Sequence, residues 1–388
     1  MIIMFKRFAA VLLAVWMTAL VLTSCAADTS APVMKYELTE VTENMYTYWT
    51  SVYKSYYLQM LGGEDTEDYL TSVITVQNDQ GELEETTVAD YLGARIREIV
   101  ESNCISLYLF DYYKLSLPTS VLSSIDEIVN AEIENAGGRK ALNEALAPIG
   151  LNADSLREMY LADEKIAHVY TYLYGDTSVG TSGAEPISTE QFNAFYEENY
   201  VCVRHIYIRT ADKNIVDEEG NAVMDEQGNV VTAELTEEEA AAKLALCDDL
   251  MARLNAGEDF LTLENEYSED AGRHTLTDGY ILSRTTALPD EFINAAFDMK
   301  IDELRRVDAS YATHIMLRCE LPELGWNNPV YESMMGNFKE YVKSEVYAEK
   351  IAPMIAEITY DEDLMAKHTV INTPITFYCY NKCRSHNG

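Results

Sequence analysis

The fold is decided by two short segments, Val203-Arg204-His205-Ile206-Tyr207-Ile208-Arg209 and Thr313-His314-Ile315-Met316-Leu317-Arg318. Both contain the pattern His-Ile-x-apolar-Arg, and both are rich in the β-branched and aromatic residues that favour strands. We therefore expect each segment to be a β-strand that carries one histidine, His205 or His314.

The residues between these strands have mainly helical patterns. In chain order we expect two helices, a loop that contains glycine, and a further helix, over residues 236–255, 260–269, 271–279 and 289–297. If the first and last strands of this series pair side by side, His205 and His314 lie close to each other.

The stretch from about Cys202 to Cys319 resembles the parvulin peptidyl-prolyl isomerase domain along nearly its whole length. The matching features are Arg204-His205-Ile206, Leu254 to Phe260, Tyr267-Ser268-Glu269-Asp270, Asp278-Gly279-Tyr280, Leu288, Phe292 to Phe297, and His314 to Leu317. This resemblance implies a small antiparallel sheet surrounded by helices. It also implies an activity that needs no cofactor and no metal.

The resemblance assigns a role to five residues. His205, His314 and Asp270 would be catalytic, and Leu288 and Phe292 would bind the proline ring of the substrate. Rotation about an X-Pro bond crosses about 18–20 kcal/mol because the twisted amide loses its resonance. A site therefore acts by favouring the twisted amide over the planar one. Each histidine could equally be a structural core residue, and Asp270 could equally cap a turn.

The chain departs from the family pattern at a few positions near the expected site. Ala309 stands where the family usually has threonine, and Ala312-Thr313 stands where it has Gly-Tyr or Gly-Ile. Leu276-Thr277 replaces a second glycine expected near Asp278. These changes motivate an alternative function, a non-catalytic chaperone that uses a degenerate parvulin domain as a binding module.

The N-terminus is typical of a bacterial lipoprotein. Lys6-Arg7 precedes the apolar run Phe8 to Leu22, and Leu22-Thr23-Ser24-Cys25 resembles a lipobox. The apolar run is shorter than the roughly 20 residues that a transmembrane helix needs. We expect a signal peptide over 1–24, a lipid on Cys25, and a location on the extracytoplasmic face of the bacterial cell membrane.

The remaining chain has a mostly helical pattern. Its series Gly137-Gly138, Arg139 to Leu146, Pro148-Ile149-Gly150 and Asn152 to Tyr174 resembles the helical N-terminal domain of SurA and PrsA-type foldases. An aromatic stripe, Tyr46, Trp49, Tyr53 and Tyr57, recurs at helical spacing and indicates a buried helix face. The expected fold class is α+β, with the parvulin domain inserted into this lobe. The expected order is a tether at 25–33, the lobe at 34–200, the parvulin domain at 201–321, a C-terminal helix within 322–371 that packs on the lobe, and a tail at 372–388.

An insertion at 215–231 interrupts the first strand-to-helix connection. Its two Gly-Asn pairs, Gly220-Asn221 and Gly228-Asn229, favour tight turns, so we expect a protruding β-hairpin. Calcium binding by the clustered carboxylates is the alternative, although their spacing is not that of an EF-hand loop.

Composition restricts the partners of this 388-residue chain. Its formal net charge of −37 argues against nucleic-acid binding. We expect its partners to be unfolded or partly folded exported polypeptides, together with the membrane through Cys25, and a homodimer is an open alternative.

The cysteines lack the close pairs of a zinc ribbon. Cys202, Cys247 and Cys319 lie in apolar-periodic segments, which predicts buried thiols. Cys379 and Cys383 could form a small disulfide.

Overall fold

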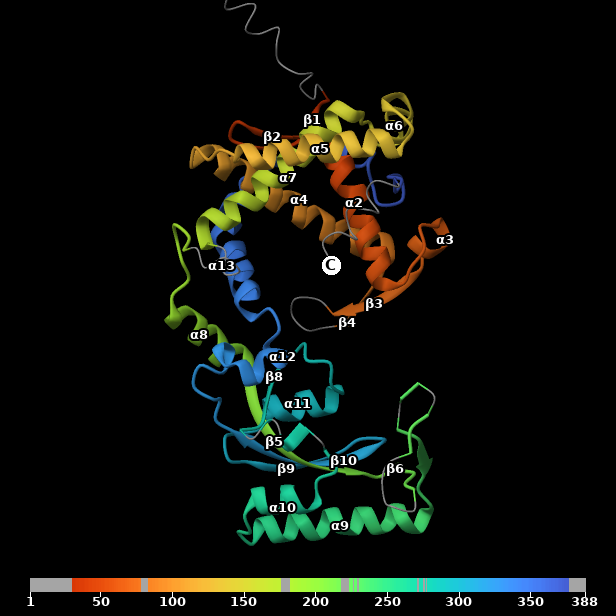
Figure 1. Cartoon of the computed structure of the whole chain (residues 1–388), viewed down its shortest axis with the longest axis vertical. Coiled ribbons are helices and arrows are strands. Elements are labelled where there is room, and N and C mark those ends of the chain that lie inside the picture. Colours follow the sequence, from red (N-terminus) through yellow and green to blue (C-terminus); the bar gives the residue numbers. More distant parts are fainter. Residues whose placement is uncertain are drawn as a thin grey trace, which may run out of the picture. The chain divides into compact units, whose positions relative to one another are not determined.

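The computed structural model describes residues 30–77, 83–175, 182–217, 223–225, 227–228, 230–270, 272–274, 276 and 278–376 (Figure 1). The predicted signal peptide, Cys25, and the pair Cys379 and Cys383 lie outside these residues. Within the described ranges, every helix is too short or too polar to span a lipid bilayer.

The chain divides into two compact units. One is formed by residues up to Pro186 and from Glu345 onward, and the other is the continuous stretch Ile187–Ser344. The second unit therefore interrupts the first in sequence. It extends beyond the predicted domain 201–321, because it includes the helices α8 (Thr189–Asn199) and α12 (Glu332–Met335).

The first unit is mostly helical. Its helices are α2 (Glu43–Leu61), α3 (Glu67–Leu70), α4 (Val88–Tyr112), α5 (Thr119–Asn135), α6 (Arg139–Leu146), α7 (Ala153–Tyr174) and α14 (Glu362–Met365), and the helix α13 (Phe338–Ile355) crosses the unit boundary. Two small antiparallel sheets accompany them. One has the order β11-β1-β2, with β11 (Thr359–Tyr360), β1 (Pro32–Tyr36) and β2 (Thr39–Thr42), and the other pairs β3 (Val73–Gln77) with β4 (Leu83–Thr87).

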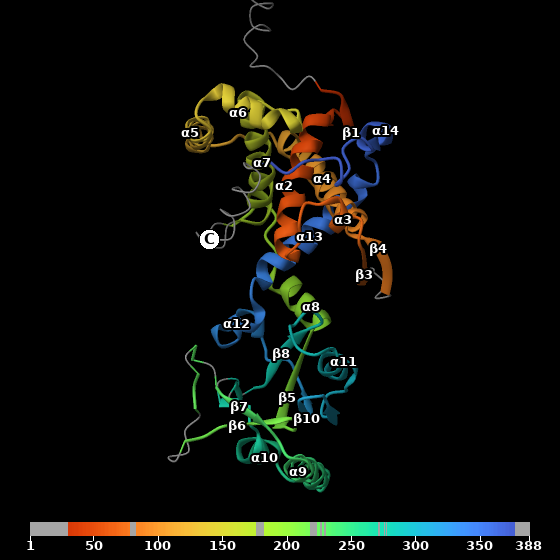
Figure 2. The same ribbon diagram turned by 90° about the vertical axis from the view of Figure 1, so that its right-hand side faces the viewer.

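The helix α4 lies beside both α2 and α7 (Figure 2). Trp49 is buried, as the stripe predicts, and its Nε1 donates a 2.9 Å hydrogen bond to Oδ1 of Asp163 on α7. The hydroxyl of Tyr48 donates to Oδ2 of the same carboxylate at 3.0 Å. Asp163 therefore ties two aromatic side chains of α2 to α7.

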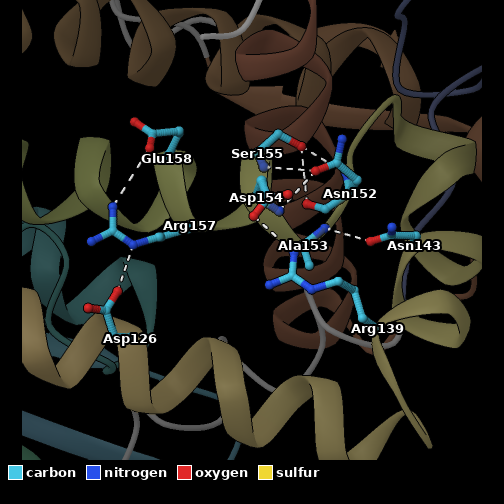
Figure 3. Close-up of polar contacts among 9 residues, drawn as sticks. All are labelled: Asp126, Arg139, Asn143, Asn152, Ala153, Asp154, Ser155, Arg157 and Glu158. Carbon is cyan, nitrogen blue, oxygen red and sulfur yellow. Dashed lines mark hydrogen bonds and ion pairs between the residues drawn. The ribbon is translucent and has the colours of Figure 1, made fainter. Parts of the chain in front are cut away.

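The start of α7 is fixed by a capping box (Figure 3). Oδ1 of Asn152 accepts from the backbone N–H groups of Asp154 and Ser155 at 2.9 and 3.1 Å, and Oγ of Ser155 accepts from the N–H of Asn152 at 2.8 Å. The helix N-terminus leaves such donors without intrahelical partners, and these side chains satisfy them. Asn143 of α6 accepts from the N–H of Ala153 at 2.8 Å, which connects the two helices.

The C-terminal residues complete the fold of the N-terminal ones. β11 pairs antiparallel with β1, with Met34 opposite Tyr360. The buried ammonium group of Lys54 on α2 donates to the carbonyl oxygen of Thr373 at 2.9 Å and pairs with Asp65 at 2.5 Å. A buried charge needs such partners, since removing it from water is costly.

The C-terminal helix predicted within 322–371 is interrupted in the structure. The structure has a 3-10 turn at Pro329–Tyr331, then α12, a break at Gly336, and only then α13. Gly336 has φ +49° and ψ −128°, a backbone conformation that is open almost only to glycine. The apolar period continues through the break, which is why the sequence pattern does not reveal it.

The second unit is built on a four-stranded antiparallel sheet of order β8-β5-β10-β9. Its strands are β5 (Tyr200–Arg209), β8 (Tyr280–Ser283), β9 (Leu304–Asp308) and β10 (Ala312–Cys319). The two predicted histidine strands are β5 and β10, and their expected pairing is confirmed. The predicted α+β class, with small antiparallel sheets among helices, is also confirmed.

Helices cover both faces of this sheet (Figure 1). On one face α11 (Asp290–Asp298) packs Phe292 and Ala296 against Val203 and Met316. On the other face α9 (Glu237–Asn255) and α10 (Phe260–Tyr267) pack against the strand residues Ile206, Ile208 and Ile315. Alternate strand residues point to opposite faces, so the two layers use alternate positions of β5.

The insertion begins as an antiparallel ladder of β6 (Asp212–Asn214) and β7 (Thr232–Glu234). Beyond it, the N–H of Ile215 donates to the carbonyl of Val231 at 2.9 Å, and an isolated bridge joins Met224 and Val230. The parts of the insertion that the structure describes are therefore paired as a hairpin.

Candidate active site

His205 and His314 meet on the α11 side of the sheet. Their ring planes are nearly parallel, with an interplanar angle of 6° and a centroid distance of 5.2 Å, and the two Nδ1 atoms lie 3.0 Å apart. The register explains this contact: His205 is opposite Met316 and His314 is opposite Tyr207, so the histidines are diagonal neighbours on one face. Their predicted proximity is confirmed.

Asp270 lies at the outer end of this pair. Its Oδ2 is 3.4 Å from Nε2 of His205. The end of α10 holds it there, because Oγ of Ser268 accepts from the N–H of Tyr207 at 3.0 Å and the N–H of Glu269 donates to the carbonyl of Tyr207 at 2.8 Å. These two bonds attach the residues before Asp270 to the strand that carries His205.

The three side chains define one arrangement of protons. The carboxylate of Asp270 only accepts, so Nε2 of His205 carries a proton. In a neutral ring Nδ1 of His205 is then the acceptor, and Nδ1–H of His314 is the donor. Nε2 of His314 is left as a bare acceptor, and this buried atom has no hydrogen-bond partner within the described residues.

Asp270 has three donors around it. Besides His205, the hydroxyl of Tyr280 donates to Oδ2, and the N–H of Gly272 donates to Oδ1 at 3.0 Å. Burial alone would raise the pKa of Asp270, but the hydrogen bonds from His205 and Tyr280 outweigh it and hold that pKa well below its usual range. Asp270 is therefore ionised at neutral pH. It also caps the turn that follows, the alternative role considered from the sequence.

His314 is held neutral. Burial, and then the proximity of His205, lower the pKa of His314 to about 4. Only 5% of this residue is exposed. At neutral pH the site therefore contains one carboxylate and an uncharged imidazole on β10.

Aromatic rings surround the histidines. The ring of Phe292 is 5.4 Å from that of His205 and 4.9 Å from that of His314, and only 3% of Phe292 is exposed. Sequence reasoning missed three tyrosines that also contact the pair: Tyr207, Tyr280 and Tyr311. Tyr207 could have been predicted from the sequence, since it is two residues after His205 and its side chain lies on the same face of the strand. Tyr280 and Tyr311 come close only through the tertiary fold.

Leu288 lies at a neighbouring cavity. It is 41% exposed and lines a space of about 790 Å³ together with Leu282, Phe297 and Phe338. Tyr280 borders this cavity and also contacts His205. The structure therefore brings His205, His314, Asp270 and Phe292 together and places Leu288 beside the adjoining cavity.

Thr313 differs from the family pattern, but it does not alter the face of the sheet that carries the histidines. Side chains alternate along a strand, so Thr313 points away from His314, and its hydroxyl donates to Oδ1 of Asp308 at 2.7 Å. Ala309 belongs to the turn before β10, where its N–H donates to the carbonyl of Ala312 at 2.8 Å. Among the described residues, no group of three or more His, Cys, Asp or Glu side chains could hold a metal ion.

This sheet, its helices and the histidine pair define a class of domain. Residues 193–318 match the family model Rotamase_3, the PPIC-type PPIASE domain, so the chain carries a parvulin-type peptidyl-prolyl isomerase domain. No match was found among curated proteins.

Solved structures similar to this chain include those of PrsA proteins. PrsA from Bacillus subtilis is 16% identical, over 77% of this chain and 93% of that one, with a TM-score of 0.23. Peptidylprolyl isomerase (PrsA) from Bacillus cereus is 17% identical, over 82% and 98%, with a TM-score of 0.27. Foldase protein PrsA from Streptococcus pneumoniae is 13% identical, over 80% and 98%, with a TM-score of 0.22.

Proposed function

We propose that this chain is a peptidyl-prolyl cis-trans isomerase that assists the folding of other polypeptides. One observation carries the proposal. Within the PPIC-type domain, Asp270, His205 and His314 form a continuous hydrogen-bonded series beside the ring of Phe292.

The chemistry requires no covalent step. In a planar X-Pro amide, resonance places partial negative charge on the carbonyl oxygen, and twisting the bond removes that charge. A carboxylate near the oxygen disfavours the planar state more than the twisted one, which lowers the barrier. Asp270 is ionised and supplies this charge, while the exposed Leu288 and the cavity that it lines offer an apolar surface to the proline ring. The histidines act as positioning residues.

A direct assay of a proline-containing peptide tests the proposal. The full chain accelerates cis-trans exchange, and Asp270→Asn lowers kcat/KM by about tenfold or more, because the variant lacks the charge that disfavours the planar amide and a loss of about 1.4 kcal/mol is a factor of ten. The matched control is Asp249→Asn, on the exposed side of α9, which leaves the rate unchanged. A wild-type rate equal to the uncatalysed one overturns the enzymatic proposal.

A second candidate function is the holding of unfolded clients without isomerisation. The observation that favours it is the burial of the site, since Phe292 and His314 are at most 5% exposed and offer a proline ring little surface. If the chain holds clients in this way, the wild-type chain suppresses aggregation of a denatured client, and the Asp270→Asn variant suppresses it equally well. If Asp270→Asn loses isomerisation and suppression of aggregation together, the result would instead favour the isomerase.

We also propose lipid attachment at Cys25 and action on exported polypeptides outside the cytoplasm of a bacterium. The basic pair, the apolar run and the lipobox-like tetrapeptide that ends at Cys25 support this. Expressed in a bacterium, the wild-type chain partitions with membranes and Cys25→Ser does not, whereas Cys247→Ser behaves as wild type. Equal partitioning of the Cys25→Ser variant would contradict the lipid anchor.

A further inference from the structure

Two cysteines face each other across the central strands of the second unit. Cys202 on β5 is the register partner of Cys319 on β10. Side chains alternate between the two faces of a sheet along each strand, so both cysteines lie on the face opposite the histidines. Sequence spacing could not reveal this pair, because it is created by the register.

The backbone spacing of such a pair suits a disulfide. Directly opposite residues of an antiparallel ladder have Cα atoms about 4.5–5.5 Å apart. Disulfides span Cα distances of about 4.4–6.8 Å. Strand register therefore already supplies the separation that the bond requires, and no strand has to shift.

The two thiols differ in accessibility. Cys202 is fully buried beneath Gly279, where even an added Cβ would lie 3.1 Å from the sulfur of Cys202. Cys319 is half-buried, so a small reagent reaches it first. In the reduced state the thiol of Cys202 donates to the carbonyl of Asp278 at 3.4 Å, and that of Cys319 to the carbonyl of Leu317 at 3.6 Å.

The charges nearby favour attack by Cys319. The neighbouring thiol of Cys202 lowers the pKa of Cys319, and Arg204 and Arg318 lower it further against the opposing effect of burial. Nη1 of Arg318 also donates to the carbonyl oxygens of both cysteines, at 2.9 and 2.6 Å, which holds the two backbones together at this point.

We propose that Cys202 and Cys319 form a cross-strand disulfide when the protein meets a disulfide oxidant such as oxidised glutathione. The thiolate of Cys319 attacks one glutathione sulfur, the glutathione S–S bond breaks, and one glutathione thiolate leaves. Cys202 then loses its proton to solvent and attacks the sulfur of Cys319, which releases the second glutathione. Two protein thiols are oxidised and one glutathione disulfide is reduced to two thiols.

The bond would join the beginning of β5 to the end of β10. These strands carry His205 and His314. It would close a loop that includes the rest of the isomerase-type domain. Closing a long loop restricts the unfolded chain, so the oxidised protein is expected to melt at a higher temperature than the reduced protein. This inference is independent of the proposed isomerase activity.

The test uses the full chain, incubated with oxidised glutathione or with a reductant, then unfolded, alkylated and mapped by mass spectrometry. After oxidation, Cys202 and Cys319 lose alkylation together and appear in one linked peptide pair that is two hydrogens lighter. Cys247, buried on α9, stays alkylated in both samples and serves as the internal control. Melting of the wild-type chain shifts upward on oxidation, and melting of Cys319→Ser does not.

Three results would overturn the proposal. The first is full alkylation of both cysteines after oxidation. The second is a glutathione adduct on Cys319 that never resolves onto Cys202. The third is a linkage of Cys319 to another cysteine. Because the mapping is done on the wild-type chain, none of these results depends on whether a cysteine variant folds.

Discussion

His314 is the residue whose chemistry depends most on its surroundings. The sequence shows a histidine in a strand, and strand pairing with its partner follows from the repeated pattern. Which ring nitrogen carries a proton does not follow, because that is fixed by Asp270 at the far end of the series. The three tyrosines around the pair were also not predictable, since their contacts depend on register and on which face each side chain occupies.

The buried His314 predicts an acid-sensitive fold. Its pKa falls from 6.5 to about 4 on folding, so the unfolded chain binds more protons between these values and stability is lost as pH falls through this window. The loss from this group is at most about 3 kcal/mol, at about 1.36 kcal/mol per pKa unit. Urea unfolding at pH 7 and pH 4.5 measures it.

The matched variants are His314→Phe and His168→Gln. His314→Phe removes the titrating group and reduces the pH dependence of the unfolding free energy. His168→Gln, on α7, keeps the wild-type dependence. An unchanged slope in the His314→Phe variant would show that this histidine does not carry the effect.

Among the elements, α7 has the most complete N-terminal cap (Figure 3). Asn152→Ala removes the acceptor of two backbone donors and is expected to lower the free energy of unfolding by about 1 kcal/mol. Chemical denaturation followed by circular dichroism measures the change. Asn199→Ala, whose amide bonds only a carbonyl within its own helix, is the comparison and should cost less.

The edge strand β8 depends on one glycine. Gly279 has φ +104°, and a Cβ there would lie 2.7 Å from the carbonyl oxygen of Val203. Gly279→Ala therefore adds a backbone clash to conformational strain and is expected to lower the unfolding free energy by more than about 2 kcal/mol. Gly257→Ala is the matched control, because φ is +93° but nothing lies within 4 Å of the added atom. Equal losses in the two variants would exclude the clash as the cause.

Helices and strands could be predicted from the sequence where one short sequence pattern determines them. The helix α9 and the two histidine strands follow from short patterns, and they occur as expected. The break at Gly336 was missed because the apolar period on either side of it continues. Pairing of Cys202 with Cys319 was missed for a different reason: spacing along the chain carries no information on register.

On the scale of the whole molecule, the stretch Ile187–Ser344 is expected to fold when produced alone. It has its own sheet and two apolar layers, and its contacts are mainly internal. A cooperative thermal transition and dispersed amide signals in an NMR spectrum would confirm this. A fragment that stays unfolded under native conditions would show that residues outside 187–344 are needed.

The pairing of β11 with β1, and of Lys54 with Thr373, has a consequence for biosynthesis. β1 also pairs with β2, and Lys54 with Asp65, but β11 and the carbonyl of Thr373 belong to residues made near the end. A chain that emerges vectorially can therefore close its middle portion early, because every strand of that sheet is local to it. The first unit therefore stays incomplete until its last residues are made, which leaves one edge of β1 open to whatever assists or captures nascent proteins.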